Sequence, residues 1–455
     1  MADPNQHVVV LIMENRSFDQ MLGCMKAVYP NLEGVDPAHP LCNPDLPTTN
    51  PPICQADSTA RTIQDDPNHD LANVLRQIQG PCQGFITDFA LKFPQSKTPE
   101  RQEVMGVYPR GFLPALHALA ENFALCDHWF SSLPGPTWPN RFFVHSGTSL
   151  GHVTMPSGIF HPNLHLYDQT TLYDRLHAKD ISWKIYYGDV PQSLVMIHQW
   201  KYPFNYSHMP NFFTDVQGAA SQFPAFVFIE PTYFGANQND QHPPTDVLKG
   251  DILMAQVYNA LRANAELWST TLLIVLCDEH GGFADHVYPP AAVPPDQNTK
   301  EYAFNQYGVR VPAILASPWI AAGVIAKVFD HTSILKYAID KWQLDSLGAR
   351  ATAANSLAPF FANAQRDTPA TIPVAQLPVT VEALARTAAQ AQPLNANQEA
   401  LLSFTQYLET QLAQVEPPSE VARRAIAFTG GPVPQAVVAQ ERVEKFLAYR
   451  RNGSL

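Results

Sequence analysis

The clearest pattern in the chain is a set of short aliphatic runs that change abruptly into polar residues. The first is "VVVLIM", Val8 to Met13, in which both the odd and the even positions are apolar. A strand that is apolar on both faces is typical of a parallel sheet covered by helices on both sides. Similar runs begin at Phe223 (FPAFVFIEP), Thr270 (TTLLIVLC) and Arg310 (RVPAILASPW), and they predict three more strands.

Between these runs lie segments whose apolar residues recur at helical intervals. They cover residues 110–124, 246–264 and 331–342. Because strand and helix patterns alternate along the chain, the predicted fold class is α/β with a mostly parallel central sheet.

The composition of the sequence changes after Gly348. An Ala/Pro/Thr-rich stretch follows, and then two helical patterns at residues 398–413 and 435–451. We therefore predict one unit over residues 1–348 and a mainly helical extension over residues 349–455, which either packs on the core or covers a site. The last helix carries Arg442, Lys445, Arg450 and Arg451. A solvated helix face is the favoured interpretation, and contact with acidic lipid headgroups is the alternative.

Composition narrows the possible partners and compartments. The chain has 455 residues, 41 prolines and a net charge of −12. This acidic balance argues against a nucleic-acid partner. No apolar run approaches the ~20 residues that cross a bilayer, and "MADPNQH" has neither the basic nor the apolar region of a signal peptide. We expect a cytoplasmic protein if the sequence is complete, and a secreted or periplasmic one if a leader was removed.

None of the six cysteines forms a CxxC pair or another zinc spacing, so a structural zinc site is not expected. Cys42 and Cys54 flank a polar, proline-rich loop and are candidates for a disulfide. The equally weighted interpretation is that most of the cysteines are buried thiols.

Candidate chemistry appears where two of the aliphatic runs end. Glu14 and Asn15 follow the first run, and Asp278 and Glu279 follow the run from Thr270. In parallel α/β sheets, ligands bind beyond the carboxyl ends of the strands. Carboxylates directly after buried strands are costly unless they are paired or hold a cation. Their oxygen ligands favour Ca²⁺, Mg²⁺ or Mn²⁺, although Zn²⁺ also accepts carboxylates.

A candidate nucleophile lies in "SSLPGPTWPNRFFVHSGTS", which begins at Ser131. Thr137 stands in a turn just before a helical start at Pro139. A hydroxyl at a helix N-terminus is well placed to attack phosphorus, because free N–H groups there favour a phosphate. Taken alone, Thr137 is more often a helix cap. The rival hydroxyls are Ser131, Ser132, Ser146 and Ser149.

The motifs ENRSFD, PGPTWPNR, NDQHPP and DEHGGFADHVYPP occur in this order. Together they resemble the phosphoesterase family that contains bacterial phospholipases C, AcpA-type acid phosphatase and plant non-specific phospholipases C, within the alkaline phosphatase-like superfamily. The resemblance runs from about residue 7 to residue 345. It implies a three-layer sandwich and a catalytic phosphoesterase domain over residues 1–348.

The resemblance also implies roles for individual residues. Glu14, Asn15, Asp278 and Glu279 match the ligands of one divalent metal ion. Thr137 matches the nucleophile, and His69 and His242 match histidines that line the phosphate pocket, so these three are the expected catalytic residues. Asn15, Asp240 and His331 are the expected phosphate-binding residues, with Asp240 beside His242.

These residues support a mechanism in two steps. A metal polarises the phosphate and activates Thr137, which displaces an alcohol and forms a phosphothreonine intermediate that water then cleaves. His69 or His242 protonates the leaving oxygen or stabilises charge.

The sequence leaves the substrate open. The preferred function is a phospholipase C that releases a phosphorylated headgroup from a phospholipid, with transient membrane contact. The alternative is an acid phosphatase acting on small phosphomonoesters. A non-enzymatic binding protein is disfavoured by the intact Glu14, Thr137, Asp278 and Glu279. Aromatic residues that include Trp129, Trp138, Tyr186 and Tyr187 are expected in the core more often than around a choline headgroup.

Overall fold

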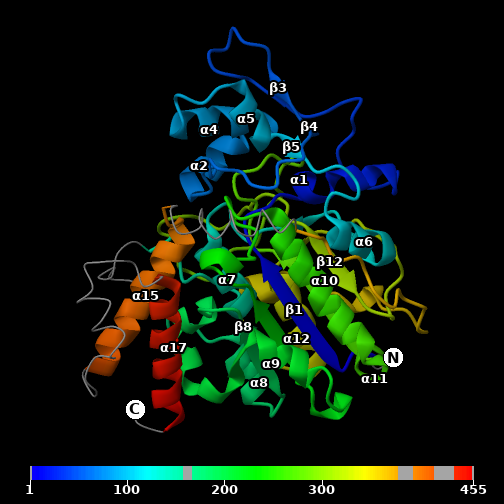
Figure 1. Ribbon diagram of the computed structural model, residues 1–455, viewed down its shortest axis with the longest axis vertical. Coiled ribbons are helices and arrows are strands. Elements are labelled where there is room, and N and C mark those ends of the chain that lie inside the picture. Colours follow the sequence, from blue (N-terminus) through cyan, green and yellow to red (C-terminus); the bar gives the residue numbers. More distant parts are fainter. Residues whose placement is uncertain (1–2, 157–166, 378–392, 414–434, 453–455) are drawn as a thin grey trace.

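The protein is built on one eight-stranded sheet. The computed structural model describes residues 3–156, 167–377, 393–413 and 435–452. The strands lie in the order β13-β6-β12-β11-β1-β10-β8-β9. Their bounds are β1 His7–Met13, β6 Ala124–Cys126, β8 Trp183–Tyr187, β9 Tyr206–His208, β10 Phe226–Glu230, β11 Thr271–Cys277, β12 Ala313–Ala316 and β13 Gly323–Ile325. The predicted α/β class is confirmed (Figure 1).

Because most strands of the sheet run in the same direction, the loops that follow them begin at one edge of the sheet. β1 pairs in parallel with both β10 and β11, and β10 pairs in parallel with β8. β12 runs antiparallel to β11 and to β6, so the aliphatic run from Arg310 forms a strand of opposite direction. The carboxyl ends of the other strands therefore share one edge.

Helices cover both faces, because β1 and β10 are apolar on both sides. The rings of Phe226 and Phe228 on β10 contact His145, Tyr173 and Trp342, which belong to α7, α8 and α12. Met13 on β1 lies next to Gly250 of α10. Met13 points to the face opposite Phe226 and Phe228 because β1 and β10 are in register, with Val8 beside Phe226 and Val10 beside Phe228. These two helical layers complete the three-layer sandwich.

The helices have the following bounds: α1 Phe18–Leu22, α2 Leu71–Gln77, α3 Gln79–Cys82, α4 Phe85–Lys92, α5 Thr98–Val104, α6 Pro114–Asn122, α7 Thr137–Ser146, α8 Leu172–His177, α9 Met209–Asp215, α10 Val247–Ala263, α11 Ala265–Trp268, α12 Thr332–Trp342, α13 Ala349–Ala353, α15 Ala396–Ala413 and α17 Gln435–Arg451. Short 3-10 turns are η1 Gly23–Ala27, η2 Gln192–Val195, η3 Ile197–Lys201, η4 Pro203–Asn205, η5 Ala220–Gln222, η6 Gly235–Asn237 and η7 Ala358–Phe360.

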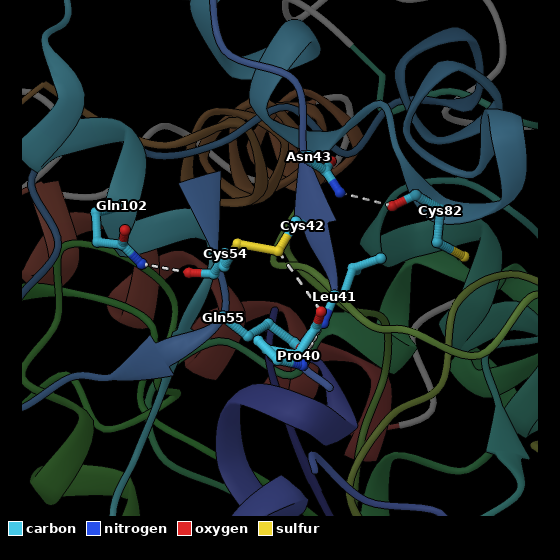
Figure 2. Close-up of a disulfide and its surroundings, with 8 residues drawn as sticks. All are labelled: Pro40, Leu41, Cys42, Asn43, Cys54, Gln55, Cys82 and Gln102. Atoms are coloured by element: carbon cyan, nitrogen blue, oxygen red, sulfur yellow. Dashed lines mark hydrogen bonds between the residues drawn. A yellow bond between two sulfur atoms is a disulfide. The ribbon is translucent and has the colours of Figure 1, made fainter. Parts of the chain in front are cut away.

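A smaller unit with its own hydrophobic cluster stands beyond the carboxyl edge of the sheet, at the top of Figure 1. It contains α2 to α5 and the short strands β2 Cys42–Asn43, β3 Ile53–Cys54, β4 Ala56–Asp57 and β5 Gly106–Val107. β2 and β3 are joined by a disulfide between Cys42 and Cys54, so the disulfide that the sequence suggested is confirmed (Figure 2). Cys24, Cys82, Cys126 and Cys277 are free thiols.

The C-terminal extension contains the two expected helices, α15 and α17, whereas residues 354–377 are mainly irregular apart from η7. α15 and α17 lie side by side at one flank (Figure 1). Phe404, Leu408 and Phe446 on these helices belong to the same hydrophobic cluster as the strands of the sheet. Residues 378–392 and 414–434 of the extension lie outside the described residues. The boundary at residue 348 stays a prediction.

The basic residues of α17 bind neighbouring parts of the protein. Arg442 pairs with Glu409 of α15. Arg450 donates to the carbonyl of Trp200, and Arg451 donates to those of Pro203 and Tyr206. This part of the helix face is therefore packed, and only partly solvated. No helix in the described ranges is long and apolar enough to cross a membrane.

Candidate active site

The two predicted acidic pairs meet at the carboxyl edge of the sheet. Met13 is in register with Cys277, so Glu14 and Asp278 leave adjacent strands at the same level. The N–H of Asp278 donates to the carbonyl of Met13 at 3.0 Å. Glu14, Asn15, Asp278 and Glu279 are completely buried. The parallel pairing of β1 and β11 thus gathers four predicted site residues.

Thr137 reaches this group from the opposite direction. It is the first residue of α7, so the helix begins two residues earlier than the sequence indicated. Its hydroxyl donates to the side-chain oxygen of Asn15 at 3.4 Å. In the first turn of α7 the N–H of Trp138 donates to the sulfur of Met155 at 3.3 Å and Pro139 has no N–H, so the turn offers an anion at most the N–H of Thr137 together with the positive end of the helix dipole.

The rival hydroxyls are all engaged elsewhere. Ser131 donates to the carbonyl of Leu133, and Ser132 donates to Asp330. Ser146 and Ser149 each donate to local carbonyls within their own turns. Among these candidates, Thr137 is the one whose hydroxyl faces the predicted metal ligands.

Asn15 occupies the centre of the site. Its backbone is left-handed, with φ of 55°, a conformation that Asn tolerates better than most residues. Its amide oxygen accepts from Thr137, and its amide nitrogen lies 3.4 Å from Nε2 of His69. The next turn is packed tightly against it, since a Cβ on Gly281 would lie 2.3 Å from the carbonyl oxygen of Asn15.

Arg141, one turn along α7 from Thr137, pairs with both acidic groups. Its Nε donates to Oδ2 of Asp278 at 2.9 Å, and one terminal nitrogen lies 3.1 Å from Oε1 of Glu14. Its other terminal nitrogen donates to the Tyr233 hydroxyl at 2.6 Å. Arg141 is fully buried, so it acts as an internal ion-pair partner.

The buried carboxyl groups of Glu14 and Glu279 have raised pKa values. Burial raises the pKa of Glu14 well above its usual range, with Asp278 adding to the shift and Arg141 opposing it. Burial is also the main cause that raises the pKa of Glu279 to about 8. Oε2 of Glu14 and Oε1 of Glu279 are buried and have no hydrogen-bond partner among the described residues. Such unpartnered carboxylate oxygens fit a bound cation.

His69 and His242 lie at the side of Asn15 away from Thr137. Their rings are edge to face, with centroids 5.9 Å apart. Nδ1 of His69 lies 3.1 Å from the carbonyl of Pro67, and Nδ1 of His242 lies 2.6 Å from that of Pro243. Each ring therefore carries its proton on Nδ1 in the neutral state and leaves Nε2 for other chemistry.

Asp240 and His331 lie beside the group but bind within the protein. Asp240 accepts from the His242 N–H at 3.1 Å and from Gln238, as expected for a residue that orients His242. Nε2 of His331 lies 2.6 Å from the carbonyl of Asp278, and its Nδ1 accepts from Trp129. Because both ring nitrogens of His331 are engaged, its geometry supports a role behind Asp278 more than the predicted phosphate contact.

Two other histidines near the motif are structural. Nε2 of His280 lies 2.8 Å from Oε1 of Gln77. His286 binds Asp19, which also pairs with Arg310. The aromatic residues Trp129, Trp138, Tyr186 and Tyr187 are buried in the core, which agrees with the favoured interpretation.

The C-terminal extension contributes one residue that the sequence did not indicate. Asn397, on α15, donates to Oε1 of Glu14 at 2.8 Å and accepts from the indole N–H of Trp138 at 2.8 Å. It is 1% exposed. No local pattern marks Asn397, because its partner is 383 positions away in the sequence.

Comparison with known proteins points to one family. The sequence profile described as "Phosphoesterase family" matches residues 5–345. Non-specific phospholipase C6 of Arabidopsis thaliana is 38% identical over 362 residues, which is 73% of this chain and 66% of that protein. Non-specific phospholipase C3 of the same plant is 33% identical over 367 residues, which is 73% of this chain and 68% of that protein. Phospholipase C B of Mycobacterium tuberculosis is 28% identical over 392 residues, or 73% of this chain and 72% of that protein. The chain thus spans about two thirds of the length of these relatives.

The solved structures that match this chain are more distant in sequence than these relatives. One is a protein in the alkaline phosphatase superfamily from Vibrio parahaemolyticus, with 11% identity, a TM-score of 0.33, and coverage of 85% of this chain and 96% of that one. Another is the lipoteichoic acid synthase LtaP from Listeria monocytogenes, with 10% identity, a TM-score of 0.37, and coverage of 92% and 94%.

Proposed function

The chain belongs to the Phosphoesterase family, and from this premise we propose that it is a metal-dependent phosphodiester hydrolase of the phospholipase C type. It releases a phosphorylated headgroup from a phospholipid through a covalent intermediate on Thr137. The observation that carries the proposal is the Thr137 hydroxyl, which faces Asn15 at 3.4 Å beside buried carboxylates.

The charge of the site supports one divalent cation. Glu14 and Asp278 share Arg141 as their ion-pair partner, and burial raises the pKa of Glu14 well above its usual range and that of Glu279 to about 8, so a bound cation would favour the ionised form of these carboxyl groups. Glu14, Asp278, Glu279 and the Asn15 amide oxygen would hold the ion. All are oxygen ligands, so Ca²⁺, Mg²⁺ or Mn²⁺ is favoured and Zn²⁺ is accepted. When bound, such an ion polarises a phosphoryl oxygen and lowers the pKa of a nearby hydroxyl.

The residues of the chain supply the remaining steps. Oγ1 of Thr137 bonds to phosphorus while the bond from phosphorus to the alcohol oxygen breaks, and the alcohol leaves with a proton. The positive end of the α7 dipole, at Thr137, favours the phosphoryl charge. Water then cleaves the new bond, releases the phosphorylated headgroup and restores the Thr137 hydroxyl.

His69 and His242 are the proposed proton carriers. Each has Nε2 free of a strong hydrogen bond, because Nδ1 is held on a backbone carbonyl. An imidazole with this freedom either donates a proton to the leaving oxygen or stabilises charge on the phosphate. Asp240 positions His242 through its backbone N–H.

Two observations bear on the substrate. The relatives found by comparison are named non-specific phospholipase C and phospholipase C, which favours a phosphodiester lipid and a transient membrane contact. The same site also fits the alternative, an acid phosphatase, because attack by Thr137 does not depend on the second ester group.

Release of p-nitrophenol tests the proposal and separates the two substrates. The enzyme is assayed with p-nitrophenyl phosphocholine and with p-nitrophenyl phosphate, before and after a chelator. We expect diester turnover that chelation abolishes and added metal restores. Fast monoester turnover with no diester turnover would replace the phospholipase proposal with the phosphatase, and full activity of a metal-free protein would contradict the site.

A further inference from the structure

Two buried residues outside the proposed metal site form a hydrogen-bonded chain that ends on Arg141. Nη1 of Arg141 donates to the Tyr233 hydroxyl at 2.6 Å. The same hydroxyl donates to Oε2 of Glu230 at 3.2 Å. Both Tyr233 and Glu230 are completely buried. The proposed reaction assigns no step to either of them.

The chemistry of these side chains fixes the direction of the hydrogen bonds. A guanidinium has only N–H donors, so the Tyr233 oxygen accepts from Arg141. Burial raises the pKa of Tyr233 well above its usual range, so the phenol keeps its proton and donates it to Glu230. The guanidinium carbon of Arg141 also lies over the Tyr233 ring, 5.4 Å from its centroid. Tyr233 therefore contacts Arg141 through both its hydroxyl and its ring.

Glu230 is the anchored end of the chain. It is the last residue of β10, and its two carboxyl oxygens accept from the first two N–H groups of η2, those of Gln192 at 2.6 Å and Ser193 at 3.2 Å. The Ser193 hydroxyl adds a bond of 2.6 Å. Burial raises the pKa of Glu230, and the charge of Arg141 is the main opposing cause. The carboxyl group is thus held by the backbone and coupled to Arg141 by charge.

The backbone around Tyr233 is held from two sides. Its N–H and that of Phe234 donate to the carboxylate of Asp189, in the loop after β8, at 3.1 and 2.9 Å. Its carbonyl accepts from the side chain of Gln398 on α15 at 2.6 Å. Segments that are far apart in the sequence therefore fix the place of one hydroxyl group.

Arg141 connects this hydroxyl to two of the proposed metal ligands. Its Nε donates to Oδ2 of Asp278 at 2.9 Å, and its Nη2 lies 3.1 Å from Oε1 of Glu14. The three nitrogens of a guanidinium lie in one plane. The bond from Nη1 to Tyr233 therefore limits how that plane can turn, and so where the other two nitrogens meet the carboxylates.

We propose that Tyr233 and Glu230 are positioning residues for the proposed metal centre. They orient Arg141, which in turn holds Glu14 and Asp278 in the arrangement that binds the cation. The inference rests on the proposed function, because it takes these two carboxylates as metal ligands. Residues that orient metal ligands without touching the ion typically change metal affinity by about 10–100-fold when they are replaced.

Direct binding of Mn²⁺ tests the inference without relying on turnover. Metal-stripped full-length protein is titrated with Mn²⁺, and the free ion is measured by electron paramagnetic resonance. We expect the dissociation constant to rise by about 10–100-fold in Tyr233→Phe, which removes the hydroxyl and keeps the ring. Tyr173→Phe is the matched control, because its buried hydroxyl contacts His145 of the same helix α7. This control should bind Mn²⁺ as the wild type does.

A double-mutant cycle tests whether Tyr233 acts through Arg141. Arg141→Lys keeps the positive charge but loses the planar group, so it should itself weaken Mn²⁺ binding. Adding Tyr233→Phe to Arg141→Lys should change the dissociation constant by less than about twofold, because no guanidinium is left to orient. Additive effects of the two changes would contradict a route through Arg141.

Glu230→Gln provides a second, independent variant. It keeps the size of the side chain but removes the charge that accepts from Tyr233, so Mn²⁺ affinity should fall in the same direction. This variant decides the question if Tyr233→Phe fails to fold.

The outcomes separate the inference from the proposed function. A wild type that binds no Mn²⁺ would overturn the proposed metal centre, and the positioning role with it. Equal Mn²⁺ affinity in the wild type, Tyr233→Phe and Glu230→Gln would overturn the positioning role alone and leave the Thr137 chemistry intact.

Discussion

At the scale of single residues, Glu14 illustrates what a sequence can and cannot reveal. A carboxylate directly after the buried strand β1 is unusual, and the repeat of this pattern at Asp278 predicts a shared site. The partners that hold Glu14 are less visible. Arg141 comes from α7 and Asn397 from α15, and both meet Glu14 because of tertiary packing. Arg141 belongs to the PGPTWPNR motif, whereas Asn397 does not stand out in its own segment.

Replacement of Asn397 by Ala should reduce catalysis more than stability. The change removes a hydrogen bond to a buried carboxylate, and bonds to charged groups contribute about 1.5–3 kcal/mol. We expect kcat/KM to fall by roughly tenfold or more. Steady-state kinetics of Asn397→Ala are compared with Glu399→Ala, an exposed residue of the same helix turn, which should be near normal. Equal activity in the two variants would show that Asn397 does not position Glu14.

Gly281→Ala should disturb the site through Asn15. Both Gly281 and the control Gly235 have positive φ, of 65° and 70°, so Ala at either position carries a similar backbone cost of about 1–2 kcal/mol. A Cβ at Gly235 meets nothing within 4 Å, while one at Gly281 meets the Asn15 carbonyl at 2.3 Å. A displacement near 1 Å lowers rates by on the order of a hundredfold. We expect kcat to fall in Gly281→Ala and to stay near the wild-type value in Gly235→Ala. Similar kcat values in the two variants would refute tight packing at Asn15.

At the scale of elements, the aliphatic runs predicted strands well where both faces are buried. β1, β10 and β11 were predicted on this basis, and so was β12, but an apolar run carries no information about direction, and β12 is antiparallel. β8 was missed because its sequence, WKIYY, mixes a Lys and aromatic residues with one aliphatic. Helices α10 and α12 were predicted to within a residue or two, because their apolar periodicity and polar ends are both clear.

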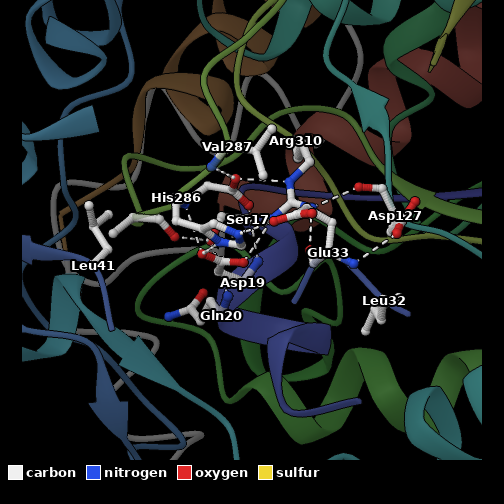
Figure 3. Close-up of polar contacts among 12 residues, drawn as sticks. Ser17, Asp19, Gln20, Leu32, Glu33, Leu41, Asp127, His286, Val287 and Arg310 are labelled. Carbon is white, nitrogen blue, oxygen red and sulfur yellow. Dashed lines mark hydrogen bonds and ion pairs between the residues drawn. The ribbon is translucent and has the colours of Figure 1, made fainter. Parts of the chain in front are cut away.

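An ionic network ties three of these elements together. Arg310, just before β12, pairs with Asp19 of α1 (Figure 3). It also pairs with Asp285 of the loop after β11. His286 adds hydrogen bonds to Asp19 and to Glu33. Burial opposes the charge of His286, but its hydrogen bond to Asp19 and the nearby carboxylates raise its pKa to about 9.

The network predicts how stability depends on pH. The usual pKa of His is about 6.5, so a folded pKa of about 9 means that the folded state holds this proton more tightly than the unfolded state. The stabilisation is fully present below pH 6.5 and is lost as the pH rises through 9, up to about 3 kcal/mol. Urea unfolding between pH 6 and pH 9.5 should show this loss in the wild type and a flatter profile in His286→Gln. Parallel profiles would contradict the role of His286.

At the scale of the whole molecule, the C-terminal helices belong to the same structure as the sheet. Phe404 and Phe446 lie in one hydrophobic cluster with the residues of β1, and Asn397 reaches the site from the same flank. The sequence predicted these helices but left open whether they pack on the core or cover the site. The helices pack on the core, and Asn397 of α15 also reaches the site. The sequence pattern reveals amphipathic helices but not the surface that they bury.

Phe404→Ala should therefore destabilise the whole protein in one transition. Removing a buried Phe side chain costs about 3–5 kcal/mol, and Phe404 is completely buried. Calorimetry should show a single unfolding peak that moves to lower temperature in Phe404→Ala and stays in place in the exposed control Thr410→Ala. A separate, low-temperature peak for the C-terminal helices would mean that they unfold independently of the sheet.

The proposed mechanism depends on a covalent bond between phosphorus and the Thr137 hydroxyl, and trapping of this intermediate tests it. The enzyme is mixed with p-nitrophenyl phosphocholine, quenched with acid during turnover, digested and analysed by mass spectrometry with fragmentation. We expect phosphocholine attached to Thr137, and no such adduct in Thr137→Ala. Modification of Ser131, Ser132 or a histidine instead, or full turnover by Thr137→Ala, would contradict it.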